Sequence, residues 1–293
     1  MRLAVFIALA LLAGCAAPPS DSPPAPSTAA ATTYVSRSVP IEVMKPDGAG
    51  PFPAVVMLHD CSGLGPRSSG SPRRWASELV AHGFVVAIPD SFSTRGFPGG
   101  VCTDPSPTRI EVGPFRRVPD AYDALDHLRS LPYVDAARIG VMGGSHGGSS
   151  TLATIVTYAR DNAQRAERKR HGFAAAIALY PACNIGQPSL ITAYASPVPL
   201  LILTGELDDW TPAAPCVELV GTAKRNGSPA EIKVYPGAHH AFDSRGPVRF
   251  VAERNNANAP GGKGATTGGN PEAWSDSIRR VEDFLAKHLQ PGA

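Results

Sequence analysis

The sequence predicts an α/β fold, in which helices flank a doubly wound and mostly parallel sheet within a single domain. Apolar runs at residues 53–59, 84–89, 173–180 and 199–204 are typical of strands that are buried on both faces. Amphipathic helical stripes separate these runs, so successive strands are expected to connect as βαβ units. A length of 293 residues and a hydrophobic content of 43% suit one domain with a large core.

Two further strands are expected before the first buried one, at residues 33–39 and 41–46. A turn rich in Gly and Pro separates them from strand 53–59. A helix with one apolar face follows that strand, and Gly83 ends it. Residues 90–114 form a long loop of Gly, Pro and Ser, and loops of this length in compact domains are usually functional.

Helices and strands also alternate through the second half of the domain. An apolar stripe from Val118 to Leu128 predicts one helix. The last helix is expected to begin at Pro271, with Asn270 as its cap and Glu272 placed favourably on the helix dipole. The strands predicted between these two helices are residues 138–142, 173–180, 199–204 and 231–235.

The N-terminal segment is expected to be an export signal rather than part of the fold. Residues 1–14 have a positive start and an apolar run that is too short to anchor the chain across a bilayer. The tetrapeptide Leu12–Cys15 resembles the lipobox of bacterial lipoproteins, in which Cys15 becomes N-terminal and lipid-modified. An ordinary secretory signal cut near Ala17 is the alternative. Because no aspartate directly follows Cys15, the resemblance implies the outer rather than the inner membrane of an exported, tethered protein.

Residues 15–32, rich in Pro, Ser and Ala, are predicted to be a tether between the lipid anchor and the domain at residues 33–293. The formal net charge of +2 is too near neutral to argue for nucleic acid as a partner. Neither a zinc-type spacing nor a phosphate-cradling or dinucleotide-binding motif is present in the sequence. We therefore expect no metal and no cofactor, and the sequence does not define an oligomeric state.

The pentapeptide Gly143–Gly147 has the pattern G-x-S-x-G and lies between a predicted strand and a predicted helix. A serine on such a sharp turn is held in strained geometry with its hydroxyl exposed at the sheet edge. Gly143 and Gly147 are expected because side chains there would collide where the strand and the helix approach each other. Ser145 is therefore a candidate nucleophile, although the pattern by itself is common.

A serine nucleophile needs a base and an orienting acid, which in a doubly wound hydrolase follow it in the order acid, then histidine. Both are expected on loops at the C-terminal ends of later strands. The loop after strand 199–204 offers Glu206, Asp208 and Asp209, and the loop after strand 231–235 offers His239 and His240. The residues alone do not separate these candidates.

The segment Tyr235–Phe242 resembles the Y-x-G-A-x-H-x-F motif of the dienelactone hydrolase family, within the α/β-hydrolases. Further similar segments are Gly205–Asp208 with Pro212, His59–Leu64, Asp90–Phe92 with Arg95–Gly96, and Gly269–Ala273. The resemblance covers residues 35–290. It implies an α/β-hydrolase fold, His240 as the base and Asp208 as the acid. The best-known members carry cysteine as nucleophile where this chain has Ser145, so the family name does not fix the substrate.

An oxyanion hole requires two backbone N–H donors. The first is expected at His146, directly after the nucleophile, and the resemblance implies Cys61 for the second. The resemblance also aligns Asp60 with an acidic residue that contacts the nucleophile in relatives; a loop hydrogen-bond acceptor is the alternative. Arg95 and Trp210 lie on loops that are expected to face the crevice, where Arg95 is either a carboxylate-binding residue or a structural anchor.

Five cysteines minus a lipidated Cys15 leave an even number in an exported chain, which suggests two disulfides. In the expected fold, Cys61 and Cys102 follow one pair of adjacent strands, and Cys183 and Cys216 follow another pair. We therefore predict the bonds Cys61–Cys102 and Cys183–Cys216, with free buried thiols as the alternative.

The predicted activity is hydrolysis of a small-molecule ester or lactone by Ser145, His240 and Asp208. Because the base must be neutral to accept a proton, activity is expected to fall on acidification. One alternative is a serine peptidase, since Gly143–Gly148 also resembles the serine motif of oligopeptidases related to acylaminoacyl-peptide hydrolases. Those enzymes carry an additional propeller domain for which this chain has no room. The other alternative is a non-catalytic binding lipoprotein.

Overall fold

Eight strands form the central sheet within the residues that the computed structural model describes, which are 32–35, 39–156, 172–184 and 188–289. Their order is β1-β2-β4-β3-β5-β6-β7-β8. From β4 to β8 every neighbouring pair is parallel, whereas β2 pairs antiparallel with both β1 and β4. The strands are β1 Thr32–Val35, β2 Pro40–Met44, β3 Phe52–Leu58, β4 Val85–Pro89, β5 Val134–Gly144, β6 Ala176–Leu179, β7 Leu200–Gly205 and β8 Ala230–Tyr235.

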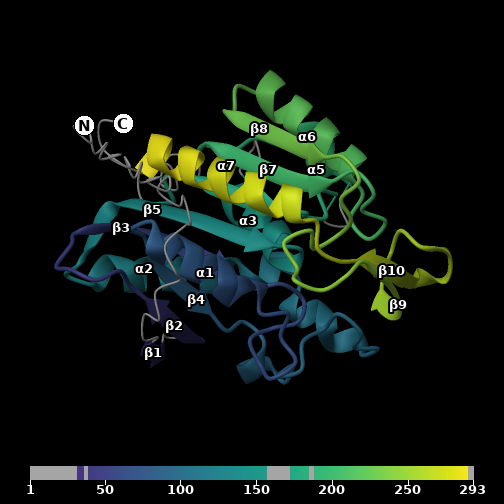
Figure 1. Ribbon diagram of the computed structural model, residues 1–293, viewed down its shortest axis with the longest axis horizontal. Coiled ribbons are helices and arrows are strands. Elements are labelled where there is room, and N and C mark those ends of the chain that lie inside the picture. The colour runs from purple at the N-terminus through teal and green to yellow at the C-terminus, as the bar shows by residue number, and fades with distance from the viewer. Residues whose placement is uncertain (1–31, 36–38, 157–171, 185–187, 290–293) are drawn as a thin grey trace, which may run out of the picture.

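Helices cover both faces of this sheet, and α7 crosses in front of it in Figure 1. Helices α1 and α7 pack on one face, and α2, α3 and α6 pack on the other. The α-helices are α1 Ser71–Ala81, α2 Val118–Ser130, α3 His146–Ile155, α5 Pro188–Ala193, α6 Ala213–Arg225 and α7 Pro271–Leu289. Short 3-10 helices occur at Ser93–Arg95, Pro107–Val112, Pro114–Arg117 and Pro260–Gly262. None of the helices in the described ranges is long and apolar enough to cross a membrane.

Strand β3 illustrates why the apolar runs have no polar face. Ala54, Val56 and Leu58 belong to the core beneath α2 and α3, whereas the alternate residues Val55 and Met57 belong to the core beneath α1 and α7. Successive side chains of a strand point to opposite faces, so a central strand between two helical layers must be apolar throughout. The predicted doubly wound α/β-hydrolase fold is confirmed.

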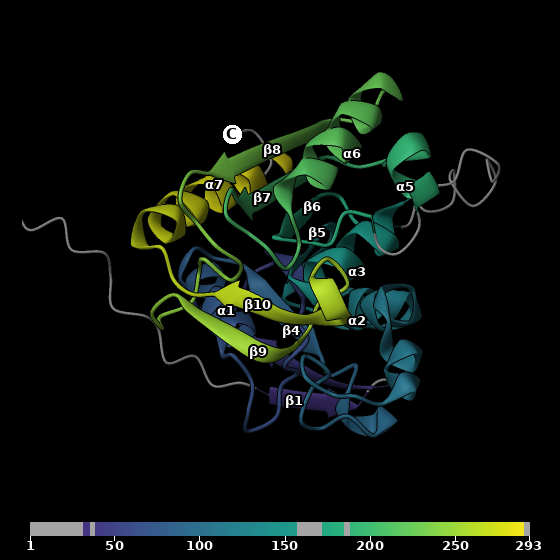
Figure 2. The same ribbon diagram turned by 90° about the vertical axis from the view of Figure 1, so that its right-hand side faces the viewer.

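The structure adds an element that the sequence analysis missed. Strands β9 (Arg249–Asn255) and β10 (Lys263–Thr267) pair antiparallel as a separate hairpin. A parallel bridge between His240 and Thr267 connects this hairpin to the loop after β8. The hairpin lies on the side of the molecule that faces the viewer in Figure 2. Most of β9 is exposed, so it lacks the apolar run that identified the central strands.

Several predicted boundaries shift, and some predictions lie outside the described residues. Strand β5 begins at Val134 rather than residue 138, and the loop at residues 90–114 contains short 3-10 helices. The predicted signal peptide, the lipidated Cys15 and the tether up to residue 31 all lie outside the described residues.

Candidate active site

Ser145 lies at the turn between β5 and α3, where its backbone adopts φ 54° and ψ −118°. This conformation is strained for a residue with a side chain. A Cβ on Gly147 would lie 1.9 Å from the Leu58 carbonyl oxygen, and one on Gly143 would lie 2.5 Å from the Gly147 carbonyl carbon. Both glycines are therefore required for the close approach of β3, β5 and α3, as the strand–turn–helix motif predicted.

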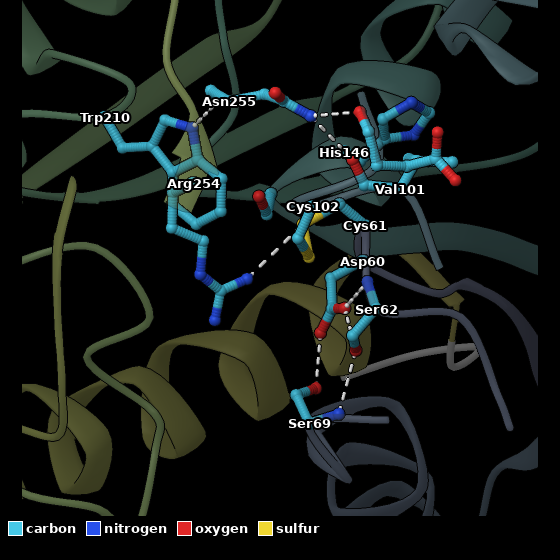
Figure 3. The surroundings of a disulfide bond; sticks show 12 residues. Asp60, Cys61, Ser62, Ser69, Val101, Cys102, His146, Trp210, Arg254 and Asn255 are labelled. Carbon is cyan, nitrogen blue, oxygen red and sulfur yellow. Dashed lines mark hydrogen bonds between the residues drawn. A yellow bond between two sulfur atoms is a disulfide. The ribbon is translucent and has the colours of Figure 1, made fainter. Parts of the chain in front are cut away.

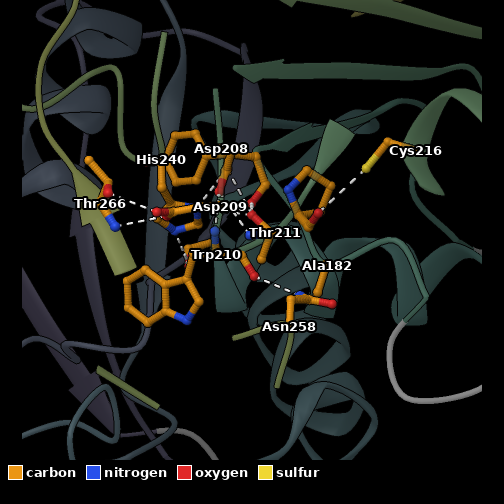
Figure 4. Close-up of polar contacts among 12 residues, drawn as sticks. Ala182, Asp208, Asp209, Trp210, Thr211, Cys216, His240, Asn258 and Thr266 are labelled. Carbon is orange, nitrogen blue, oxygen red and sulfur yellow. Dashed lines mark hydrogen bonds and ion pairs between the residues drawn. The ribbon is translucent and has the colours of Figure 1, made fainter. Parts of the chain in front are cut away.

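Three side chains from different loops form one hydrogen-bonded chain. His240 Nε2 lies 2.9 Å from Ser145 Oγ, and His240 Nδ1 lies 2.8 Å from Asp208 Oδ2. Thr211 Oγ1 lies 2.9 Å from both His240 Nδ1 and Asp208 Oδ2 (Figure 4). It also donates to the Tyr180 carbonyl oxygen at 3.0 Å. His240 is 1% exposed, so these contacts lie in a site from which bulk water is largely excluded and where hydrogen bonds are electrostatically strong.

The structure separates the candidates that the sequence left open. His240, and not His239, contacts both Ser145 and an acid within the described residues. Asp209 instead accepts hydrogen bonds from β10, from a backbone amide at 2.8 Å and a threonine hydroxyl at 2.7 Å (Figure 4). Glu206 is exposed, and its side chain accepts from the Gly237 amide at 3.0 Å, away from His240. The geometry therefore selects the same pair that the family resemblance implied.

The two predicted oxyanion donors lie on loops that leave the sheet side by side. Strands β3 and β5 pair as far as Leu58 and Gly143, and Cys61 and Ser145 line the same cavity. His146 is the first residue of α3, where a backbone N–H has no partner within the helix. Among the hydrogen bonds of the described residues, neither the His146 nor the Cys61 amide donates to a backbone carbonyl, so both are available to an oxyanion.

Arg117 is a completely buried clamp between two loops of the site. Its Nη1 donates to the His59 carbonyl oxygen at 2.9 Å and lies 2.8 Å from His146 Nδ1. Burial, followed by the Arg117 cation, lowers the pKa of His146 to about 3. The His146 ring is therefore neutral at pH 7 and can accept this hydrogen bond.

Both predicted disulfides are present, each with a Cα–Cα distance of 5.0 Å. Cys61–Cys102 joins the loops after β3 and β4 (Figure 3). Both of its cysteines line the same cavity as Ser145. Cys183–Cys216 joins the loop after β6 to α6. Ligand-type atoms of Asp60, Cys61 and Cys102 lie within 4.8 Å of one another. The two sulfurs are bonded to each other, however, and are not the thiolates that bind a metal.

A cavity of about 690 Å³ opens over Ser145 and His240, a volume suited to a small molecule. The hairpin forms part of its wall through Arg249, Val251 and Arg254. The charged side chains around the cavity are Arg67, Arg74, Arg249, Arg254, Asp60, Asp104 and Asp243. The cationic side chains therefore outnumber the anionic ones.

The acids of the cavity already have partners, whereas most of the arginines lack an acid. Asp60 accepts hydrogen bonds from Ser62 and Ser69 (Figure 3), and Asp243 lies 3.8 Å from Arg74. Within the described part of the chain, Arg67, Arg249 and Arg254 form no salt bridge with a carboxylate. The buried Nε of Arg254 also has no hydrogen-bond partner there.

A family model provides the assignment. The model described as "Dienelactone hydrolase family" matches residues 40–289. The chain belongs to the dienelactone hydrolase family. A candidate dienelactone hydrolase from Klebsiella pneumoniae has a similar structure, with a TM-score of 0.62, 20% identity, and coverage of 88% of this chain and 98% of that one. Esterase 2 of Thermogutta terrifontis, in a structure phosphorylated by paraoxon, has a TM-score of 0.61, 19% identity, and coverage of 92% and 98%.

These identities show a shared fold. The uncharacterized Escherichia coli protein YcjY is 34% identical over 92 residues, which are 31% of this chain and 27% of that protein. The matched part therefore spans only about a quarter of this curated relative. The family assignment supports a hydrolase, and the individual relatives do not define the substrate.

Three side chains of this dienelactone hydrolase family member were candidates for substrate contact, and for Arg95 that interpretation is wrong. Its guanidinium pairs with both oxygens of Asp120 at 2.6 Å and does not line the cavity, so the structural-anchor alternative holds. Asp60 lines the cavity, but serines occupy its carboxylate, as expected for a loop acceptor. Trp210 does line the cavity, with its ring 4.7 Å from that of His240.

Asp243 lies in the turn after His240, and its carboxylate is a buried acceptor. Its carboxylate accepts from Tyr180 Oη and Trp75 Nε1 at 2.8 Å each, and from Ser71 Oγ. The Tyr180 ring packs edge-on against His240 at 4.8 Å, so Asp243 supports the histidine from behind. Its position three residues after His240 was the only sequence signal for this role.

Proposed function

We propose that this member of the dienelactone hydrolase family is a serine hydrolase that cleaves carboxylic esters or lactones through an acyl-enzyme. The observation that carries the proposal is the hydrogen-bonded chain from Ser145 Oγ through His240 to Asp208. A serine hydroxyl is a weak nucleophile at neutral pH and needs such an oriented base. Family membership supports the hydrolase class.

In the proposed mechanism, Ser145 Oγ bonds to the substrate carbonyl carbon while its proton passes to His240 Nε2. The amides of Cys61 and His146 donate to the resulting oxyanion. Collapse of this intermediate breaks the ester C–O bond, and the leaving alkoxide takes the proton from His240. Asp208 accepts from His240 Nδ1 and stabilises the transient imidazolium. Water then attacks the acyl-enzyme in the same way, which releases the acid and restores Ser145.

We further propose that the preferred esters carry an acidic group. Arg67, Arg249 and Arg254 surround the cavity without a salt-bridged carboxylate in the described residues. A guanidinium can bind a carboxylate or phosphate oxygen pair bidentately. An anionic ester or lactone is therefore expected to bind more tightly than a neutral ester of the same shape.

An organophosphate probe tests the nucleophile. Phosphorylation of the Thermogutta terrifontis esterase by paraoxon supports the choice of probe for this fold. A fluorophosphonate should label the folded protein, and labelling should disappear in Ser145→Ala while circular dichroism stays unchanged. Labelling that persists in Ser145→Ala, or that is absent from the folded wild-type protein, would overturn the proposal in favour of another nucleophile or a non-catalytic binding protein.

A substrate panel then separates esterase from peptidase. p-Nitrophenyl acetate, an aryl lactone and a peptide p-nitroanilide should be compared at equal enzyme concentration. We expect turnover of the ester and the lactone with little cleavage of the anilide. Faster cleavage of the anilide would support the peptidase alternative.

We also propose that the protein is exported and attached to a membrane through lipidated Cys15. The two disulfides support an oxidising compartment, because disulfides persist outside the cytosol. Metabolic labelling with a palmitate analogue should mark the wild-type protein and not Cys15→Ser. Equal labelling of both proteins would contradict lipidation at this residue.

A further inference from the structure

A completely buried arginine joins the two loops that carry the candidate oxyanion donors. Arg117 lies at the end of a 3-10 helix directly before α2 and is 0% exposed. Its Nη1 bonds the His59 carbonyl oxygen, two residues before Cys61, and the ring of His146. One guanidinium nitrogen therefore contacts both loops that must be aligned for an oxyanion hole.

Aromatic rings hold this guanidinium in place. Its central carbon lies 5.1 Å from the Phe92 ring centroid. The Phe92 ring in turn packs edge-on against His59 at 4.5 Å and against His146 at 5.5 Å. Arg117 and the two histidines therefore form one packed unit around Phe92, so a change in any of them is expected to move the others.

The guanidinium of Arg117 has no direct ion pair within the described residues, although the carboxylates of Asp120, Asp60 and Asp90 act on its charge from a distance. Its Nε and Nη2 atoms are buried without a hydrogen-bond partner, and no carboxylate forms a salt bridge with it among the described residues. Nearby Asp120 is already paired with both terminal nitrogens of Arg95. Burial lowers the pKa of Arg117 to about 10, so the group still carries its charge at neutral pH. A buried cation without a direct ion pair is costly, so a further anion close to it is expected to be stabilised.

We infer that Arg117 is a positioning residue for the oxyanion hole, aligning the amides of Cys61 and His146 and favouring the negatively charged tetrahedral intermediate over the neutral ester. The inference rests on the proposed serine hydrolase mechanism. Holding the two loops together explains the two hydrogen bonds of Nη1. It does not explain why a charged group is buried there with Nε and Nη2 unpaired. Asp120, Asp60 and Asp90 act on the Arg117 charge without forming a salt bridge with it in the described residues, and the anion that forms beside the His146 amide adds a further negative charge.

Two substitutions at Arg117 separate charge from packing. Arg117→Met keeps much of the apolar stem and removes the charge, whereas Arg117→Lys keeps a charge and loses the planar fork. We expect Arg117→Met to lower kcat about 10- to 100-fold with little change in KM, because the lost interaction acts on the transition state. Arg117→Lys should recover part of this loss. Arg116→Met is the matched control, because Arg116 is the exposed neighbour and is expected to keep wild-type kcat.

A trifluoromethyl ketone adds a readout that a structural role would not move. This class of inhibitor forms a tetrahedral anion on the serine, so its Ki should rise by the same factor as kcat falls. Circular dichroism and Tm must first show that each variant is folded at the assay temperature. Wild-type kcat in folded Arg117→Met, or an unchanged Ki, would overturn the inference.

His146→Leu provides a second test if Arg117→Met does not fold. It removes the ring acceptor while keeping the backbone amide and the buried cation. A fall in kcat with a matching rise in Ki would support the inference, and wild-type values for both would overturn it. Failure of the proposed function itself would be distinct, because wild-type protein would then show neither fluorophosphonate labelling nor ester turnover.

Discussion

The cavity has two parts that are built in different ways. What we call its inner wall is the bonded group Ser145, His240 and Asp208 with the amides of Cys61 and His146, all beyond the C-terminal ends of parallel strands. Ser145 and His240 line the cavity, and Asp208 bonds His240 from behind. The rim of the cavity consists of Arg67, Arg249 and Arg254, which lie on loops and on the β9–β10 hairpin. The three inner-wall side chains are at most 8% exposed and are bonded to one another. The rim side chains are exposed or half-buried and have no acid partner within the described residues.

Under the proposed function, bond cleavage belongs to the inner wall and substrate selection belongs to the rim. Groups that share a buried hydrogen-bonded chain act as a unit, so removing one is expected to reduce turnover greatly. Separate exposed cations act on a substrate one at a time and are screened by salt. Inner-wall variants should therefore change kcat, and rim variants should change KM for charged substrates.

The largest effect is expected for the acid of the inner wall. Asp208→Asn should lower kcat by about 10,000-fold, because the amide cannot stabilise the imidazolium and favours the wrong tautomer of His240. Asp209→Asn is the matched control and should change kcat less than about 3-fold, since that carboxylate bonds β10 instead. Steady-state kinetics with p-nitrophenyl acetate provides the measurement. An equal loss of kcat in the two variants would show that Asp208 does not have a catalytic role distinct from that of Asp209.

The disulfides provide the next comparison, because only one of them borders the inner wall. They close loops of 41 and 33 residues, so chain entropy predicts a similar stabilisation of about 4 kcal/mol for each. Cys61→Ser/Cys102→Ser should also lower kcat, by about 10-fold, because it frees the loop that carries an oxyanion donor. Cys183→Ser/Cys216→Ser should lose stability with nearly unchanged kcat. Both pairs should be assayed well below Tm, and equal kcat values would contradict the positioning effect.

The fold and the inner wall could be predicted because their physical signals are local. Strands between two helical layers must be apolar throughout, and a serine at a strand-to-helix turn requires flanking glycines such as Gly143 and Gly147. The choice between Asp208 and Asp209, and between His239 and His240, depends on where side chains point. Strand ends place both members of each pair near the site, so the family resemblance was needed to choose between them.

The rim and the burial of Arg117 could not be predicted, because they depend on long-range contacts rather than on local sequence signals. Hairpin strands with one exposed face carry mixed side chains, so β9 has no apolar run to identify it. Arg95 and Arg117 both end short 3-10 helices, yet tertiary packing pairs the first with Asp120 and buries the second. Asp243 likewise gains its buried partners from segments more than 60 residues away. These contacts join residues that are far apart in the chain, so they cannot be inferred from the spacing of residues in the sequence.

Acid should destabilise the protein through a histidine behind the inner wall. His59 is 0% exposed, with Nδ1 donating to the Asp60 carbonyl oxygen at 2.8 Å and Nε2 accepting from the Ser91 amide at 3.2 Å. Burial and the Arg117 cation hold the pKa of His59 well below its usual value, so the ring stays neutral in the folded state. The unfolded chain gains this proton below about pH 6.5 and the folded chain does not.

Stability should therefore fall as pH falls below 6.5, by about 1.4 kcal/mol per pH unit from this residue, and should be unaffected by it above that pH. Urea unfolding at pH 7, 6 and 5 provides the free energies. His59→Asn should be less stable at pH 7 but should show a shallower slope between pH 6.5 and 5. An unchanged slope would indicate that other groups account for the acid sensitivity.

The smallest effect is expected at the rim. Arg254 stacks on Trp210 at 4.9 Å and has its buried Nε free of partners, so it is the rim residue best placed to bind an acidic group. Arg254→Leu should raise KM for an anionic ester about 10-fold, and for a neutral ester of the same shape less than about 2-fold, with kcat retained. The difference in KM between the two esters should shrink at high salt because the rim is partly exposed.

Arg245→Leu is the matched control, since Arg245 is exposed and does not line the cavity. Equal KM changes for both esters in Arg254→Leu would mean that Arg254 contributes shape rather than charge.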